Sequence, residues 1–291
     1  MKNASHALRE IRHLDPKRDH QQIVFLSLCY DFPIDSGVLS VMILLRSFSA
    51  LRISKIVDGT GIWHKQGSQR AASLVYAIAQ LIGKGYDSES GRATIARMNA
   101  VHGHYKTNND DFVYLLSRFV FDPVEWNDRF GWRRFCEREK LALYYFWQEV
   151  GRRMNIRDVP QSYEGLKQFM IDYEREQCRP AEANLRLYVA LRDGLAGWLP
   201  AVFRPFFRLA LPCVLDATLR QNLMLDPPSR FAQTMTITGL RLRAWLGAWL
   251  PSRCEAYPLR DRPPFFFGRG DHLLPQAPAS AAIRGAAAPA C

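Results

Sequence analysis

Hydrophobic residues recur along most of the chain at intervals of three and four residues, the spacing that places side chains on one face of an α-helix. The stretch 69–82 shows the pattern well, with Leu74, Ile78 and Leu81 on one face. No run alternates apolar and polar residues as a half-buried β-strand requires. We therefore predict an all-α fold.

Turn and capping residues divide this pattern into separate helices. Asp15-Pro16 has the form of an N-cap followed by proline at the first helical position. Asp122-Pro123 is expected to end the helix that passes through Tyr114 and Phe119. The other expected helices begin at Pro33, run from Ser88 or Ser90 to about His104, cover 69–82, 137–154, 162–175 and 180–199, and extend from about Pro228 to Leu250.

One helical domain is expected over residues 14–250. Residues 1–13 form an N-terminal extension, and 251–291, rich in Pro, Gly, Arg and Ala, are expected to be a disordered tail. A chain of 291 residues with 48% hydrophobic residues can bury a core large enough to enclose a cofactor. The sequence leaves the oligomeric state undetermined.

Charge and cysteine content argue against several classes of protein, namely nucleic-acid-binding, thiol-redox and secreted proteins. The net charge is +11, but the positive charge is scattered, with no dense basic run interleaved with aromatics, so no nucleic-acid partner is expected. The six cysteines form no C-x-x-C pair. The polar segment 1–18 is unlike a secretory signal, and the apolar stretch 37–45 is too short to span a membrane. We predict a cytoplasmic protein with free thiols, allowing peripheral contact with a membrane.

The most informative short segment is 97–105, Arg-Met-Asn-Ala-Val-His-Gly-His-Tyr. On a helix His102 shares its face with Met98 and Tyr105, whereas His104 points about 160° away, so the two histidines cannot bind one iron from one side. A haem iron needs an imidazole on a rigid helix. Spacing alone leaves two readings for His102, a haem ligand or an ordinary core or surface histidine.

Patterns for other chemistries are absent. The sequence contains a single E-x-x-H, at residues 10–13, whereas a helical di-iron site needs two, and it contains no H-E-x-x-H, no G-x-G-x-x-G, no P-loop and no G-x-S-x-G. Helical di-iron, zincin, nucleotide-binding and α/β-hydrolase functions are therefore not expected.

Several short motifs occur together in a characteristic order between about residues 14 and 250. They are Leu14-Asp15-Pro16-x-Arg18-Asp19-His20, Gly85-Tyr86-Asp87-Ser88, Arg97-Met98-Asn99-x-x-His102-Gly103, Asn109-Asp110-Asp111-Phe112-x-Tyr114, Phe121-x-Pro123-x-x-Trp126, Phe130-Gly131-Trp132-Arg133 and Phe146-Trp147-x-x-Val150-Gly151-Arg152-Arg153-Met154. In this arrangement the chain resembles the family of the latex-clearing rubber oxygenase and the MpaB-type oxygenase.

The resemblance implies a fold that is globin-like in character around haem b, and a reaction that uses dioxygen. The two named members cleave isoprenoid carbon–carbon double bonds, so an apolar, isoprenoid-like substrate is expected. The family's axial ligand falls on His102. Arg97 belongs to the same motif and is assigned to the haem edge or to a structural salt bridge. Met98 and Tyr105 share the face of His102 and are taken as cofactor contacts, although an exposed helix position also suits Tyr105.

The residues expected on the opposite side of the predicted haem differ from those usual in the family. Relatives tend to carry an arginine, polar residues and a threonine on the preceding helix, and this chain has Arg70 but Leu74 in place of the threonine. Arg70 is the candidate catalytic residue. Because distal polar groups decide what happens to bound dioxygen, two functions stay open. The chain is a haem oxygenase, or it is a haem or lipid carrier of the same fold without turnover.

The last predicted helix, from about Pro228 to Leu250, mixes arginines with large apolar residues. Arg241 and Arg243 alternate with Trp245, Leu246 and Trp249. We expect this helix to pack into the core with its arginines in solvent. The alternative is a helix seated on an anionic membrane, which would suit a peripheral-membrane structural protein.

Overall fold

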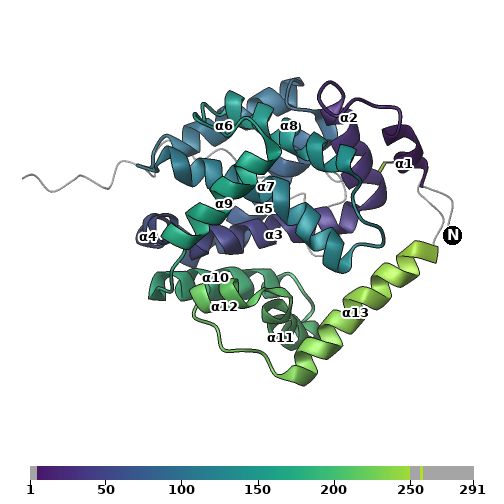
Figure 1. The fold of residues 1–291 in the computed structure, drawn as a ribbon. Helices are drawn as coiled ribbons and strands as arrows, with labels where there is room; N and C mark the ends of the chain where they lie inside the picture. Colours follow the sequence, from purple (N-terminus) through teal and green to yellow (C-terminus); the bar gives the residue numbers. More distant parts are fainter. Residues whose placement is uncertain (1–4, 250–255, 258–291) are drawn as a thin grey trace, which may run out of the picture.

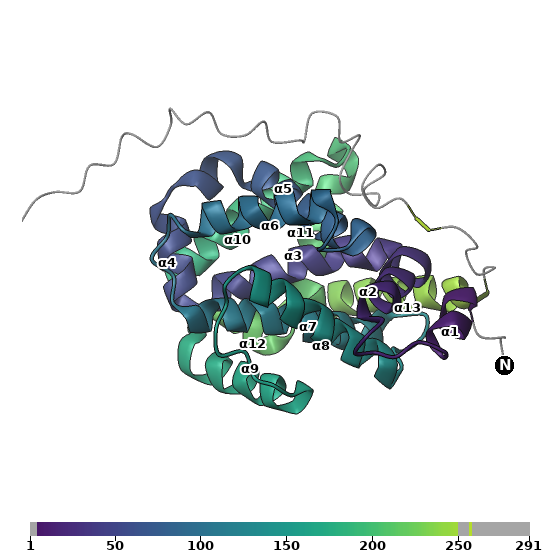
Figure 2. The same ribbon diagram turned by 90° about the horizontal axis from the view of Figure 1, so that it is seen from above.

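In a computed structural model, residues 5–249 and 256–257 are described, and their regular structure is helical (Figures 1 and 2). The prediction of an all-α fold is confirmed; the described residues form no sheet, only an isolated bridge between Ala50 and Cys178. The elements are α1 (His6–Ile11), α2 (His20–Phe25), the π-helix η1 (Leu26–Asp31), α3 (Pro33–Ser49), α4 (Leu51–Gly59), α5 (Ile62–Lys84), α6 (Glu89–His102), α7 (Asn109–Phe130), α8 (Glu137–Arg153), α9 (Tyr163–Gln177), α10 (Glu182–Gly197), the 3-10 helix η2 (Ala201–Phe203), α11 (Arg204–Val214), α12 (Ala217–Asn222) and α13 (Arg230–Trp249).

The buried hydrophobic residues form two clusters that share helices α5 and α7. The first joins α1, α2, η1, α4, α6, α8 and α9 to these helices. The second joins α3, α10, α11 and α12 to them. In Figure 1 the helices α10 to α13 lie below the rest of the molecule, with α3 and α7 between the two parts. The two clusters thus lie on either side of shared helices, which is why one domain holds both.

Two predicted helix ends are wrong. Asp15 does not start a helix; its carboxylate accepts hydrogen bonds from the N–H groups of Lys17 and Arg18, which closes a turn, and α2 begins only at His20. Helix α7 does not stop at Pro123 but continues to Phe130. Proline removes one helical hydrogen bond, and at this position burial of the following turns of α7 in both clusters outweighs that loss.

A buried group of charges crosses the centre of the molecule. The guanidinium of Arg118 on α7 is 1% exposed and pairs with Asp122 one turn later. Arg46 on α3 lies 3.0 Å from the same carboxylate and 2.9 Å from Asp216 at the start of α12. Arg118 also pairs with Glu125 at 3.1 Å. Burial acts to lower the pKa of Arg118, but Asp122 and Glu125 outweigh it and raise that pKa, so the residue stays charged.

The predicted boundaries at residues 13 and 250 stay predictions. Within the extension over 1–13, α1 buries Ala7 and Ile11 in the first cluster. The predicted disordered tail, 251–291, lies outside the described residues except for positions 256 and 257.

Candidate haem-binding site

Helix α6, which carries the candidate ligand, starts from a turn that only small residues fit. The hydroxyl of Ser88 accepts a hydrogen bond from the N–H of Gly91 at 3.0 Å and caps the first turn. A Cβ atom on Gly91 would lie 2.1 Å from the carbonyl oxygen of Gly85 and 2.8 Å from the Cα of Tyr86. Gly85 itself has φ of 81°, a conformation that favours glycine. These residues let α6 fold back against α5.

Gly91→Ala is expected to lower the free energy of unfolding by about 2 kcal/mol, because the new methyl group meets backbone atoms that can move only together with the turn. The matched control is Gly83→Ala near the end of α5, where a Cβ atom meets nothing within 4 Å. That variant should be unchanged or up to about 1 kcal/mol more stable. Urea unfolding followed by circular dichroism measures both, and equal stabilities would contradict the close packing at Gly91.

His102 is the last residue of α6 and is half-buried. Its ring packs against Phe112 of α7, with 5.2 Å between ring centroids. Its Nδ1 is buried and has no hydrogen-bond partner within the described part of the chain. Burial lowers the pKa of His102. The imidazole is therefore held neutral at physiological pH, and the neutral form is the one that binds a metal.

The other residues of the 97–105 segment differ in exposure. His104 lies beyond the helix and is exposed, with its Nδ1 2.5 Å from the carbonyl oxygen of Ala100. Met98 packs against the first cluster, and Tyr105 is half-buried. Arg97 is exposed and forms no ion pair with any described residue, so the structure provides no salt bridge for the structural role expected of it.

A hydrogen-bonded network supports the first turns of α6. The Nε2 of His20 lies 2.5 Å from the hydroxyl of Tyr86, and its Nδ1 lies 2.8 Å from the carbonyl oxygen of Lys17. The guanidinium of Arg153 covers the ring of Tyr86 at 4.1 Å and pairs with Asp87 at 2.7 Å. Burial raises the pKa of Tyr86 to about 12, so its hydroxyl stays protonated.

The same network ties α6 to α8 and was not predicted. The side-chain amide of Asn99 donates to the carbonyl oxygen of Arg153 at 3.1 Å. The sequence did not single out His20 beyond its place in the first motif, yet its side chain is buried, at 9% exposed. Its partner Tyr86 is 66 residues away. His20 and Tyr86 both belong to the family motifs. That is the only signal in the sequence from which a contact between them could have been predicted.

Helix α5 lies against α6 and carries the two residues expected on the distal side. Arg70 and Leu74 are one turn apart and both half-buried. Leu74 packs against the first cluster, and Arg70 has no ion pair or hydrogen bond with the described residues. Because α5 and α6 are packed against each other and joined by a short turn, Arg70 and His102 each lie about 20 Å from that turn at 1.5 Å per residue.

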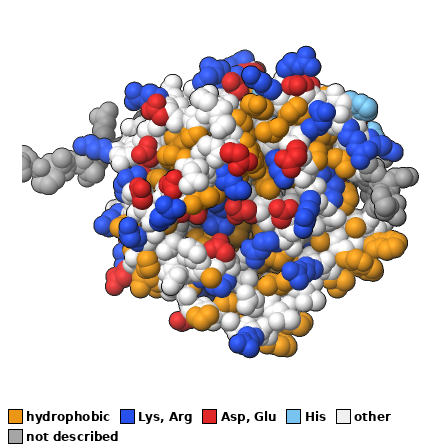
Figure 3. Space-filling view, viewed as in Figure 1, with side chains coloured by type: hydrophobic (Ala, Val, Ile, Leu, Met, Phe, Trp, Pro, Cys, Tyr) orange, Lys and Arg blue, Asp and Glu red, His pale blue; other side chains and the backbone are white. Residues whose placement is uncertain are grey.

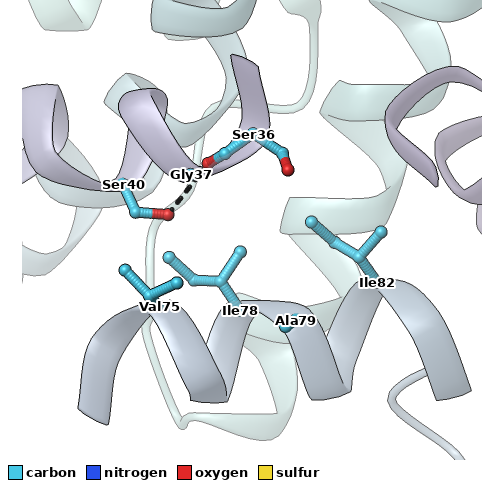
Figure 4. Close-up of a pocket in the computed structure, with 7 residues that line it drawn as sticks. All are labelled: Ser36, Gly37, Ser40, Val75, Ile78, Ala79 and Ile82. Atoms are coloured by element: carbon cyan, nitrogen blue, oxygen red, sulfur yellow. Dashed lines mark hydrogen bonds between the residues drawn. The ribbon is translucent and has the colours of Figure 1, made fainter. Parts of the chain in front are cut away.

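A hollow between α3 and α5 lies one turn further along α5 (Figure 4). Its cavity volume is about 10 Å³, room for about one water molecule, whereas most ligand sites have roughly 300–1,000 Å³. Small residues line the α3 side and apolar residues the α5 side, namely Ser36, Gly37, Ser40, Val75, Ile78, Ala79 and Ile82. Ile78 follows Leu74 by four positions, so the hollow continues the face of Leu74. His102 does not border it.

The chemistry of His102 fits an axial haem ligand. Its imidazole is neutral, and its buried Nδ1 lacks a partner. The described residues contain no group of three or more His, Cys, Asp or Glu side chains placed to hold a metal ion by themselves. A haem iron takes its equatorial ligands from the porphyrin and needs only an axial side chain from the protein. The roles of His102, Arg97, Met98, Tyr105 and Arg70 stay predictions.

Comparisons with known proteins agree with the resemblance seen in the motifs. The family model described as "ER-bound oxygenase mpaB/B'/Rubber oxygenase, catalytic domain" matches residues 44–248. The chain is 22% identical to ER-bound oxygenase mpaB' of Penicillium brevicompactum, over 68% of this chain and 51% of the relative. It is 22% identical to ER-bound oxygenase mpaB of Penicillium roqueforti (strain FM164), over 67% of this chain and 71% of the relative. The chain thus spans about half the length of the first relative.

The names of these relatives contradict the cytoplasmic location predicted from the sequence. Both are called ER-bound, which points to membrane association. The prediction rested on the missing apolar leader and span, and a protein can reach a membrane without either. Among the described residues no single helix is long and apolar enough to cross a membrane. Only the segments His20–Asp31 and Pro33–Ser49 taken together have the length and composition of a span, and the chain bends by 107° between them.

Proposed function

The chain belongs to the family of ER-bound mpaB-type oxygenases and rubber oxygenases, and we propose from this premise that it is a haem b-dependent oxygenase with His102 as the axial ligand. The family is one of oxygenases. The observation that carries the finer proposal is the neutral imidazole of His102, whose buried Nδ1 has no hydrogen-bond partner in the described part of the molecule.

A bound haem supplies an iron centre for redox chemistry with dioxygen. The contribution of the protein is to bind and orient. His102 holds the ligating nitrogen at the end of a helix fixed by Phe112 and Asn99. Arg97, exposed and free of ion pairs with the described residues, supplies a charge for the carboxylates at the haem edge. Arg70, also without such a partner, supplies a charged hydrogen-bond donor on the distal side.

The substrate is proposed to be apolar and isoprenoid-like. This proposal rests on the family resemblance and on the apolar residues Leu74 and Ile78 of α5, since apolar side chains bind hydrocarbon through burial rather than through hydrogen bonds. The hollow of Figure 4 is too small to hold such a substrate in this structure.

Leu74 also favours a second function, a haem or lipid carrier of the same fold without turnover. A leucine packed against the core cannot donate a hydrogen bond to a ligand, whereas a threonine at this position could. The two functions differ only in turnover.

The absorption spectrum of the purified full chain, titrated with haemin, tests the proposal. We expect saturable binding at one haem per chain, with a Soret band characteristic of histidine ligation. A protein that gives only the spectrum of free haemin would contradict haem binding. Dioxygen consumption by the haem-loaded protein with squalene as the isoprenoid probe then separates the functions, since a carrier gives no uptake above the protein-free rate.

A further inference from the structure

Helix α13 exposes a row of large hydrophobic side chains along one face, interrupted only at Thr238 and Gly239. Their positions are separated by three, four or seven residues, the spacing of one helical face. The row, called here the α13 stripe, consists of Phe231, Met235, Leu242, Trp245, Leu246 and Trp249. Each of these side chains is at least half exposed, and Phe231 reaches 76%. At 1.5 Å per residue the stripe is about 27 Å long.

The opposite face of α13 is the one that packs against the protein. Ala232 is buried, and Ile237 and Leu240 pack against the second cluster. Arg243 turns inward and pairs with Asp35 of α3 at 2.7 Å. The expectation of a core-packed helix with its arginines in solvent is therefore wrong for this side chain, because a buried carboxylate binds it while the large apolar residues face out.

Neighbouring elements extend this apolar surface. Helix α11 packs against α13, and on η2 and α11 the side chains of Val202, Phe203, Phe206 and Leu209 are 55–67% exposed. Figure 3 shows hydrophobic side chains gathered at the lower right, where α13 lies in Figure 1. Monomeric soluble proteins seldom expose large contiguous apolar surface, and where they do it marks an interaction site.

The charge around the stripe is positive. Between Gly194 and Trp249 the chain has six arginines and only two acidic residues, Asp216 and Asp226. Arg230 and Arg241 on α13 are exposed and have no ion pair or hydrogen bond with any described residue. The spacing of eleven residues between Arg230 and Arg241 is close to three helical turns, so both side chains lie along the same edge of the stripe. An apolar face with aromatic residues and flanking arginines is the pattern of a helix that lies in the interface of an anionic membrane.

We propose that α13, with the exposed residues of η2 and α11, docks this protein onto the surface of an anionic lipid bilayer. The tryptophans and leucines of the stripe would enter the boundary between headgroups and acyl chains, and Arg230 and Arg241 would pair with lipid phosphates or carboxylates. A second copy of the chain is the less favourable occupant, because the net charge of +11 and the flanking arginines would repel across such an interface. The proposal does not depend on haem binding.

Co-sedimentation of the full chain with vesicles tests the proposal. We expect strong binding to phosphatidylcholine vesicles that contain phosphatidylserine and weaker binding to phosphatidylcholine alone. Trp245→Ser/Trp249→Ser should lower the partition coefficient at least about tenfold on both, because two exposed aromatic side chains no longer enter the bilayer. Arg230→Gln/Arg241→Gln should lower binding several-fold on the anionic vesicles only. Ile171→Ser on α9, an exposed apolar residue outside this surface, is the matched control and should bind as wild type does.

Several results would overturn the proposal. They are failure of the wild-type chain to bind anionic vesicles, unchanged binding by the tryptophan variant, or an equal loss in the Ile171→Ser control. A wild-type dimer in sedimentation velocity that becomes monomeric in the tryptophan variant, with no vesicle binding, would assign the stripe to a second copy. Far-UV circular dichroism establishes that the variants are folded. Since the haem spectrum is recorded separately, loss of vesicle binding leaves the proposed oxygenase function intact, and the reverse also holds.

Discussion

His102→Ala is expected to abolish haem binding, with the apparent affinity for haemin falling at least about 100-fold, because it removes the only axial ligand proposed here. The ring of His102 contacts Phe112 alone among aromatic residues of the described chain, so the variant loses little packing. The wild-type Soret band should be missing from the spectrum of the variant titrated with haemin.

His104→Ala is the matched control for this variant. His104 is exposed and two positions away, and among the described residues its side chain is hydrogen-bonded only to the carbonyl oxygen of Ala100, so its removal should leave the Soret band intact. Free imidazole added to His102→Ala should restore the band, since it can occupy the space left by the side chain. That rescue separates a ligand from a residue that only stabilises the fold. Loss of the band in His104→Ala, or its survival in His102→Ala, would contradict the assignment of His102 as the ligand.

Arg118→Leu is expected to lower the free energy of unfolding by about 3 kcal/mol, because it leaves the buried carboxylate of Asp122 with only Arg46 as a charged partner. The carboxylate cannot reach water, since Asp122 is 4% exposed. Burial raises the pKa of Asp122 and the two arginines oppose that rise. Removing Arg118 should therefore raise this pKa further. Urea unfolding at neutral pH measures the loss.

Two further variants test whether burial is the cause. Arg175→Leu breaks an ion pair with Asp172 on the surface of α9, where Arg175 is 70% exposed, and should cost about 0.5 kcal/mol or less. Arg118→Leu/Asp122→Leu removes the uncompensated charge as well and should recover much of the stability lost in the single variant. A double variant less stable than Arg118→Leu alone would contradict this explanation.

The sequence predicted the helices well because their signals are local. Caps, glycines and apolar spacing place α6 and α8 within about two residues of the structure, the usual uncertainty of helix ends. The failures at Asp15 and Pro123 have different causes. At Asp15 local hydrogen bonds to Lys17 and Arg18 close a turn in place of a first helical turn. At Pro123 tertiary packing of the following turns continues the helix.

The candidate site was predictable along one helix but not between helices. The structure separates His102, which is half-buried, from His104, which is exposed, but His104 lies beyond the end of α6, so the end of the helix and not helical phase separates them. The support from His20 and Arg153 could not be found in this way, because their contacts to Tyr86 join residues 66 and more positions apart. The inward turn of Arg243 depends on Asp35, 208 residues earlier, and no local pattern indicates it.

The network around Tyr86 has a consequence for the time at which the protein can first bind a cofactor. His20 emerges from the ribosome early, Tyr86 and Asn99 later, and Arg153 well after α6 itself has been synthesised. Until Arg153 has left the exit tunnel, α6 lacks its attachment to α8, and the imidazole at its end is not held in place. If the proposed haem binding holds, a nascent chain that stops before α8 should not retain haem even though it already contains His102. Under that proposal, haem is loaded in the later half of translation or after release of the protein.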